Sequence, residues 1–250
     1  MEEKRNFDLL TLGQVLLRLS PPNNDRLVRG DTFVKQVGGA ELNVAVGVAL
    51  LGLRTGVISK LPSHDMGSFM KGKIRSYGVS DDFFMYDDSP SARVGIYYYE
   101  NGAYPRKPKV IYDRANSSFY SLKIDEIPEK AYTASRCFHT SGITLALSPK
   151  VRETAIEMIK RFKAAGTLVS FDVNFRGWTG EEAKECIEQI LPYVDIFFCS
   201  EDTARLTFKK TGTAREMMKS FTEEYPISIV ASTQRIVHSP KSHTFGSIIY

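Results

Sequence analysis

Two adjacent glycines, Gly38 and Gly39, stand directly before an apolar run of helical length in the segment QVGGAELNVAVGVALLGL (36–53). Glycine has no Cβ atom, so it makes a tight turn without strain. Backbone N–H groups at the start of a helix can also hydrogen-bond a ligand directly. The two glycines therefore predict either a simple turn or a ligand cradle.

Polar residues with binding chemistry also follow several apolar segments that are typical of β-strands. In a parallel sheet, ligands bind at the carboxyl ends of the strands. The strands expected at 167–173, 195–200 and 226–233 place five polar residues at or just beyond their ends: Asn174, Arg176, Ser200, Glu201 and Thr233.

Strand-like and helical segments alternate along most of the chain. The clearest helix is 148–166, where Ser148 is placed as N-cap, Pro149 opens the first turn and Gly166 follows the last. Capping boxes beginning at Thr179 and Thr213 predict two further helices. The segment 40–52 is apolar nearly all round and predicts a buried helix. The alternation favours an α/β fold, with a mostly parallel sheet and helices on both faces.

One region departs from this alternation. Residues 90–114 hold two aromatic-rich β-segments separated by ENGAYPRKP, which predicts a hairpin. Together with 15–22 and 31–37, the hairpin is expected to form a small separate sheet inserted on the main domain.

The composition excludes several function classes. The chain has 250 residues, 42% hydrophobic and 25% charged, and a formal net charge of only +4 without a basic block, so nucleic acid is not an expected partner. The three cysteines are far apart and the four histidines have no metal-ligand spacing, so we expect reduced thiols, a cytoplasmic location and no protein-bound metal. Neither a signal peptide nor a membrane span is expected. No nucleophile elbow and no Walker A loop occurs.

Several segments together resemble the ribokinase-like, PfkB-type carbohydrate kinases, and 2-keto-3-deoxygluconate kinases in particular. Besides the double-glycine segment, they are GQVLLRLSPP, GIYYYE, VIYDRANSS, HTSGITLALSP and DVNFRGWTG. The resemblance implies a ribokinase-like three-layer sandwich with a small β lid. It also implies transfer of phosphate from ATP, with Mg²⁺, to 2-keto-3-deoxy-D-gluconate or a related sugar acid.

The resemblance assigns roles to residues that match the family's motifs. Gly38 and Gly39 would meet the sugar hydroxyls, and Asn43 would reach the same sugar. Tyr97 and Tyr112 would close over the substrate, although β-sheet aromatics more often only pack. The fork-shaped guanidinium groups of Arg114 and Arg176 would hold the sugar carboxylate, with a structural ion pair as the alternative for each. The full set expected at the substrate is Gly38, Gly39, Asn43, Tyr97, Tyr112, Arg114, Asn174 and Arg176.

The nucleotide side is expected to use Ser200, Thr233 and Arg235. Thr233 and Arg235 match a turn after the last strand, near the ATP phosphates. The family's usual magnesium-network glutamate is replaced by Thr203, so Glu201 or Asp202 is the candidate substitute.

The Gly-Ala-Gly-Asp-like segment, which carries the family's general base and anion hole, does not occur in these 250 residues. We therefore expect a single ribokinase-like domain (1–250) without its C-terminal part, a lid from about 14–37 and 91–115, and little or no kinase activity. The alternatives are a non-catalytic sugar-acid binding protein and an inactive kinase remnant. The expected partners are the sugar acid, ATP and a second copy paired through the lid; the sugar's identity stays open.

Overall fold

The main body of the molecule is built on a nine-stranded sheet. The computed structural model describes residues 5–174, 180–239 and 242–250 of the chain. The strand order is β13-β12-β11-β10-β9-β1-β4-β5, with β6 also paired to β4; β13 is antiparallel to β12 and the other pairs are parallel. The strands are β1 (Phe7–Leu12), β4 (Thr55–Pro62), β5 (Val79–Ser80), β6 (Phe84–Asp87), β9 (Ser135–Ser141), β10 (Leu168–Asp172), β11 (Ile196–Phe198), β12 (Ile229–Ser239) and β13 (Ser242–Ile249).

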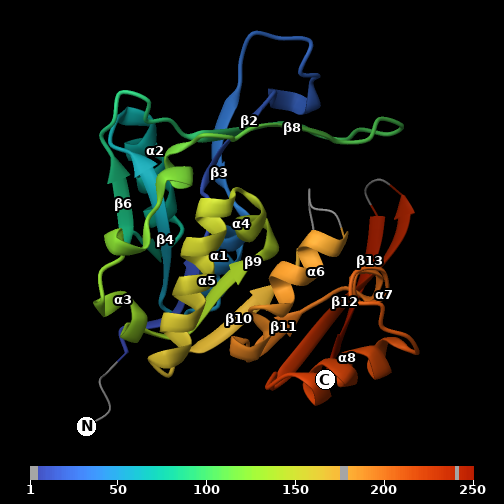
Figure 1. Cartoon of the computed structure of the whole chain (residues 1–250). Helices are drawn as coiled ribbons and strands as arrows, with labels where there is room; N and C mark the ends of the chain where they lie inside the picture. The colour runs from blue at the N-terminus through green and yellow to red at the C-terminus, as the bar shows by residue number, and fades with distance from the viewer. Residues whose placement is uncertain (1–4, 175–179, 240–241) are drawn as a thin grey trace.

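Helices pack on both faces of this sheet, as the alternating pattern predicted (Figure 1). Neighbouring residues of β4 show the two faces: Val57 packs with α1 and α2, whereas Ile58 belongs to the core shared with α5 and α8. The helices are α1 (Ala40–Leu50), α2 (Asp65–Ser76), α3 (Lys130–Thr133), α4 (Gly142–Ala146), α5 (Pro149–Ala164), α6 (Gly180–Glu188), α7 (Glu201–Leu206) and α8 (Ala214–Glu224), with short 3-10 turns η1 (Pro22–Asn24), η2 (Ser118–Ser121), η3 (Ile124–Glu126) and η4 (Leu191–Tyr193).

Local sequence signals account for the best-defined helices. In α5 the Ser148 hydroxyl accepts a hydrogen bond from the Val151 N–H at 3.2 Å, and Gly166 leaves the helix with φ +72°. The predicted capping box of α8 is present: Thr213 and Glu216 each accept a hydrogen bond from the other's backbone N–H. The other predicted box begins at Thr179, which lies outside the described residues.

Part of one face of the sheet carries exposed apolar side chains. The second face of β10, β11 and β12 carries Leu168, Phe198 and Ile229, which are 50%, 39% and 40% exposed. The expectation that 40–52 forms a buried helix is wrong, because Leu50 at the end of α1 and its C-cap residue Leu51 are about four-fifths exposed. Figure 1 shows α5, α6 and α8 together in front of the sheet.

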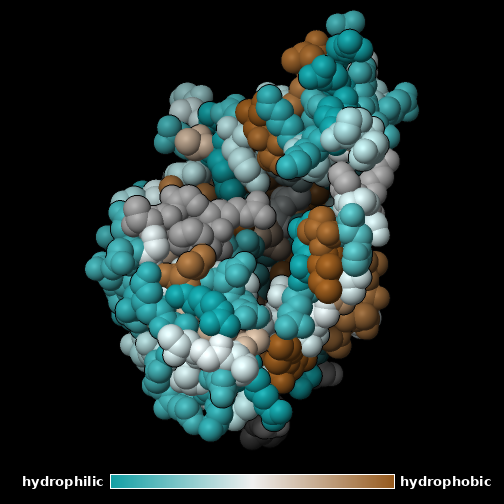
Figure 2. Space-filling model, turned by 90° about the vertical axis from the view of Figure 1, so that its right-hand side faces the viewer, coloured by the Kyte–Doolittle hydropathy of each residue, from teal (hydrophilic) through white to brown (hydrophobic). Residues whose placement is uncertain are grey.

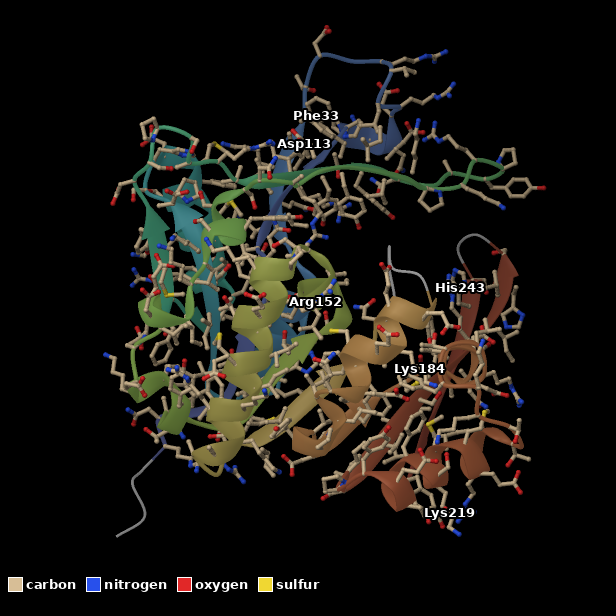
Figure 3. The ribbon with its side chains drawn as sticks, viewed as in Figure 1. Phe33, Asp113, Arg152, Lys184, Lys219 and His243 are labelled. Carbon is tan, nitrogen blue, oxygen red and sulfur yellow. The ribbon has the colours of Figure 1, made fainter. Side chains whose placement is uncertain are left out.

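A separate four-stranded sheet forms the predicted lid above the body. Its order is β3-β2-β7-β8, and the aromatic-rich strands β7 and β8 form the antiparallel hairpin expected from residues 90–114. The strands are β2 (Leu16–Ser20), β3 (Val34–Gly38), β7 (Gly95–Glu100) and β8 (Lys109–Asp113). Figure 3 labels Asp113 at the end of β8 and Phe33 directly before β3.

The end of the last parallel strand corrects a second expectation. Thr233 and Arg235 do not lie in a turn, because β12 continues to Ser239 and pairs with β13, placing Thr233 opposite Ser247 and Arg235 opposite Phe245. The polar run after Ala231 predicts a loop, but an antiparallel strand pair with an exposed surface tolerates polar side chains. None of the helices in the described part of the chain combines the length and apolar character needed to cross a bilayer.

Candidate functional site

A cavity of about 510 Å³ lies between the lid sheet and the body. Figure 2 shows the surface hollowed between these two parts of the molecule. Six of the eight residues predicted for the substrate line this cavity: Gly39, Asn43, Tyr97, Tyr112, Arg114 and Asn174. Gly38 is buried beneath it, and Arg176 lies outside the described residues.

The two glycines are required by close packing rather than by a simple turn. A Cβ atom on Gly38 would lie 2.6 Å from the hydroxyl oxygen of Tyr97. Gly39 is the N-cap of α1 with φ +147°, and a Cβ atom there would lie 2.7 Å from the backbone oxygen of Gln14. Side chains at these positions would displace the lid tyrosine and the chain segment between β1 and β2. Only glycine fits at both positions, which is compatible with the predicted ligand cradle.

Tyr97 and Tyr112 form a cross-strand pair on the inner surface of the lid. Their rings are 6.0 Å apart, and burial raises the pKa of Tyr97, so its hydroxyl stays neutral. The two phenol side chains next to a polar cavity offer hydroxyl groups for a polyol and rings for its apolar face.

Arg114 follows β8 and is held by a residue that the sequence analysis did not identify. Its Nε donates a hydrogen bond to Gln14 Oε1 at 2.7 Å, and Gln14 Nε2 donates to Ser117 Oγ at 2.6 Å and to the Arg114 backbone oxygen at 3.2 Å. Gln14 is buried and also lines the cavity. This amide fixes the direction of the Arg114 stem, which helps a guanidinium to meet a carboxylate in one orientation.

Two further charged residues at the cavity were missed. Arg18 stands opposite Tyr97 in the lid register, and its guanidinium lies 4.3 Å from the centre of the Tyr99 ring. The period-two alternation of β2 could have indicated that Arg18 shares the inner face with the tyrosines. Glu41, by contrast, is buried by contacts far away in the sequence, and no local pattern reveals that.

The end of β10 connects this cavity to a second one. Asp172 Oδ1 accepts a hydrogen bond from the Asn174 N–H at 3.1 Å, and Asn174 adopts φ +32°. Burial raises the pKa of Asp172, and nearby Glu41 adds to that effect. Asn174 lines both cavities, so it stands where two ligands could meet.

The second cavity, of about 860 Å³, contains the residues predicted for the nucleotide. Ser200, Thr233 and Arg235 all line it, although the Ser200 hydroxyl also caps α7 by accepting from the Thr203 N–H at 3.1 Å. The Arg235 guanidinium lies within 3.2 Å of a ring nitrogen of His243, which Figure 3 labels on β13. The described lining of this cavity thus combines hydroxyl groups, the Arg235 cation and the carboxyl groups of Asp172 and Asp202.

The two candidate acidic residues at the start of α7 differ in whether they line the second cavity. Glu201 Oε1 accepts from Arg205 at 2.9 Å in a bridge along the helix, and Glu201 does not line the cavity. Asp202 does line it. No group of three metal-ligating side chains occurs within the described ranges 5–174, 180–239 and 242–250.

Comparison with known proteins assigns the family. A model of the pfkB family of carbohydrate kinases matches residues 6–234. The chain is 34% identical over 229 residues, 91% of its length, to a 2-dehydro-3-deoxygalactonokinase of Haloferax volcanii, of which it covers 71%.

Solved structures agree with this assignment. A 2-dehydro-3-deoxygluconokinase from Thermotoga maritima superposes with a TM-score of 0.91 at 32% identity, covering 98% of this chain and 76% of that one. A putative 2-keto-3-deoxygluconate kinase from Enterococcus faecalis gives a TM-score of 0.88 at 26% identity, with 98% and 75% covered. The chain therefore belongs to the pfkB family of carbohydrate kinases.

Proposed function

We propose that the lid cavity binds a 2-keto-3-deoxy sugar acid and that the second cavity binds ATP for its phosphorylation. The observation that carries this proposal is Arg114, a cation oriented by Gln14 in a cavity whose lining also includes hydroxyl, amide and aromatic groups and a second cation, Arg18. A sugar acid needs that combination, because its carboxylate requires a charged donor and its hydroxyls require small polar groups. The relatives from Haloferax volcanii and Thermotoga maritima are both named as kinases of such sugar acids.

On the nucleotide side, Asp202 is the residue we expect to contact Mg²⁺ bound to ATP. Mg²⁺ is often held by one or two carboxylates together with substrate phosphates, so a three-carboxylate cluster is not needed. Asp202 lines the cavity, whereas Glu201 is engaged with Arg205. The ion would neutralise phosphate charge during transfer. Arg235, which we expect near the phosphates, would contribute positive charge from β12.

Calorimetric titration with 2-keto-3-deoxygluconate tests the sugar-acid site. Replacement of Arg114 by Lys keeps the charge but removes the two-pronged contact, so affinity should fall by about 10–100-fold, the range of a lost hydrogen bond to a charged group. Arg136→Lys is the matched control, because Arg136 is exposed and pairs only loosely with Asp8 at 3.6 Å. No binding by the unaltered chain at millimolar ligand would refute the proposed site.

Turnover is a separate question from binding. Because the Gly-Ala-Gly-Asp-like segment is not among these 250 residues, a polypeptide of this sequence should consume ATP with the sugar acid only negligibly; a general base alone contributes about 10²–10⁴-fold. A coupled assay of ADP release measures this. Phosphorylation at an ordinary kinase rate would contradict the expectation. Binding without turnover would favour the alternative that these residues form a sugar-acid binding protein.

We further propose that two copies pair through the outer face of the lid. Phe33 contacts Tyr98 there with ring centres 6.0 Å apart, and Ile111 stands opposite Tyr98 in the strand register. Phe33 and Ile111 are each nearly half exposed. Sedimentation of the chain and of Ile111→Asp should show a dimer and a monomer, respectively; a monomeric unaltered chain would contradict the pairing.

A further inference from the structure

Glu41 is the one acidic side chain among the described residues that line the lid cavity. It is the second residue of α1 and is only 2% exposed. Its Oε1 accepts hydrogen bonds from two buried hydroxyl groups, from Ser141 at 2.6 Å and from Thr144 at 2.8 Å. Glu41 therefore joins the start of α1 to the end of β9 and to α4.

The opposite oxygen of this carboxyl group is packed against backbone. A Cβ atom on Gly13 would lie 2.2 Å from Glu41 Oε2, so only glycine leaves room for the carboxyl at that place. Since Oε1 accepts two hydrogen bonds, a proton on Glu41 would sit on Oε2. The two oxygens of this carboxyl group thus differ: Oε1 accepts hydrogen bonds, and Oε2 can carry a proton.

The charge state of Glu41 depends on opposing effects of its neighbours and of its burial. The two hydroxyl donors, the Arg114 guanidinium and the start of α1 favour the charged form. Full burial opposes it, and Asp172 at the end of β10 is a second carboxyl close enough for mutual repulsion. Burial is the largest of these influences, and it raises the pKa of Glu41.

We propose that Glu41 is a positioning and specificity-determining residue of the sugar-acid cavity: its buried carboxyl group holds Ser141 and Thr144, and the charge on that group sets how strongly the cavity attracts an anionic sugar. The inference rests on the proposed function of this cavity. An ionised Glu41 would compete with the sugar carboxylate for Arg114, and its negative charge would repel the sugar carboxylate. The neutral form leaves the cations Arg114 and Arg18 to select an anionic sugar, and it leaves the lining residues Gly39 and Asn43 in place.

Both the stability of the chain and its affinity for a sugar acid should fall as rising pH ionises Glu41. Because the native state keeps the proton on Glu41 above the pH at which the unfolded chain loses it, rising pH costs stability relative to an uncharged variant. Rising pH also brings negative charge into the cavity, so binding of a sugar acid should weaken. Among the described residues, the charged or titratable groups that act on Glu41 are Arg114 and Asp172.

Calorimetry with 2-keto-3-deoxygluconate from about pH 5 to about pH 9 tests this, a range that covers the raised pKa values known for buried glutamates. The unaltered chain should lose affinity by about tenfold or more, equivalent to one pKa unit of coupling, whereas Glu41→Gln should keep its affinity. Glu157→Gln, on the solvent side of α5 and paired with Arg161, should behave like the unaltered chain. Glu41→Ala should bind weakly at every pH, because Ser141 and Thr144 lose their acceptor.

Two measurements without ligand complete the test. The infrared band of a protonated carboxylic acid should disappear in Glu41→Gln at neutral pH, and the melting temperature of Glu41→Gln relative to the unaltered chain should rise with pH. Parallel binding profiles of the unaltered chain and Glu41→Gln, or no difference in the infrared band, would overturn the inference and leave the proposed function intact. Absence of any sugar-acid binding by the unaltered chain would overturn both.

Discussion

Replacement of Gly39 by Ala tests whether the cradle is built by the backbone. Gly39 has φ +147° and ψ +142°, a region that is essentially restricted to glycine and costs another residue about 1–3 kcal/mol. The added methyl group would also lie 2.7 Å from the Gln14 backbone oxygen, and a backbone atom cannot rotate away as a side chain can. Together these effects should lower the free energy of unfolding by about 3 kcal/mol, at the upper end of that range.

Urea unfolding followed by circular dichroism measures this change, and thermal unfolding should show a decrease of about 6–12 °C for a chain of this size. Gly47→Ala is the matched control in the same helix. Nothing lies within 4 Å of a Cβ atom at Gly47, so alanine there should stabilise the chain by about 1 kcal/mol through helix propensity. A Gly39→Ala chain within about 0.5 kcal/mol of the unaltered one, the usual scatter of neutral substitutions, would refute the reasoning.

Three other substitutions examine the core, a buried histidine and a helix cap. Phe162→Ala should cost about 3–5 kcal/mol in urea unfolding, because Phe162 is fully buried with its ring stacked 4.0 Å from Phe138. Burial lowers the pKa of His139 from 6.5 to about 4, so the unaltered chain should lose stability between those values as pH falls, by about 1.4 kcal/mol per pH unit at most, and His139→Asn should remove that slope. Thr213→Ala should cost about 1 kcal/mol in the same assay; no change would mean that the capping box of α8 contributes nothing.

The parts of the fold that the sequence predicted are those set by local chemistry. Ser148, Pro149 and Gly166 delimit α5 because capping and backbone preference act within a few residues. The lid hairpin was predictable for the same reason, since aromatic β-segments flank a turn-rich loop. In both cases the residues that decide the structure are neighbours in the sequence.

The errors arose where distant segments decide the structure. The polar residues from Thr233 to Arg235 are strand because β13 pairs with them, and no local pattern announces that partner. The outer surface of α1, including Leu50, is apolar yet exposed, so hydrophobicity alone did not report burial. Glu41 is the opposite case, because Gly13 and Ser141 bury a carboxyl that would ordinarily lie in solvent.

At the candidate site, the family motifs predicted which residues gather but not how they are held. Asn43, Tyr97 and Arg114 come from three separate segments, and the fold brings them to one cavity. Their supports were not predictable, because Gln14 reaches Arg114 across 100 residues of sequence. A buried amide shows no periodicity that distinguishes it from a surface glutamine.

Gln14 contacts both Gly39 and Arg114, which gives a final prediction about the energetic coupling between these two residues. The Gln14 backbone oxygen limits what fits at Gly39, and its side chain holds Arg114. The methyl group of Gly39→Ala should push the Gln14 backbone and thereby misplace Arg114. Sugar-acid affinity should therefore fall further than the loss of the proposed contact between Gly39 and the sugar alone explains. In a double-mutant cycle, Gly39→Ala and Arg114→Lys should show a coupling of about 0.5–3 kcal/mol, as residues sharing a partner do. Additive losses would show that Gln14 transmits nothing between the glycine cradle and the arginine, and that the two recognise the sugar acid independently.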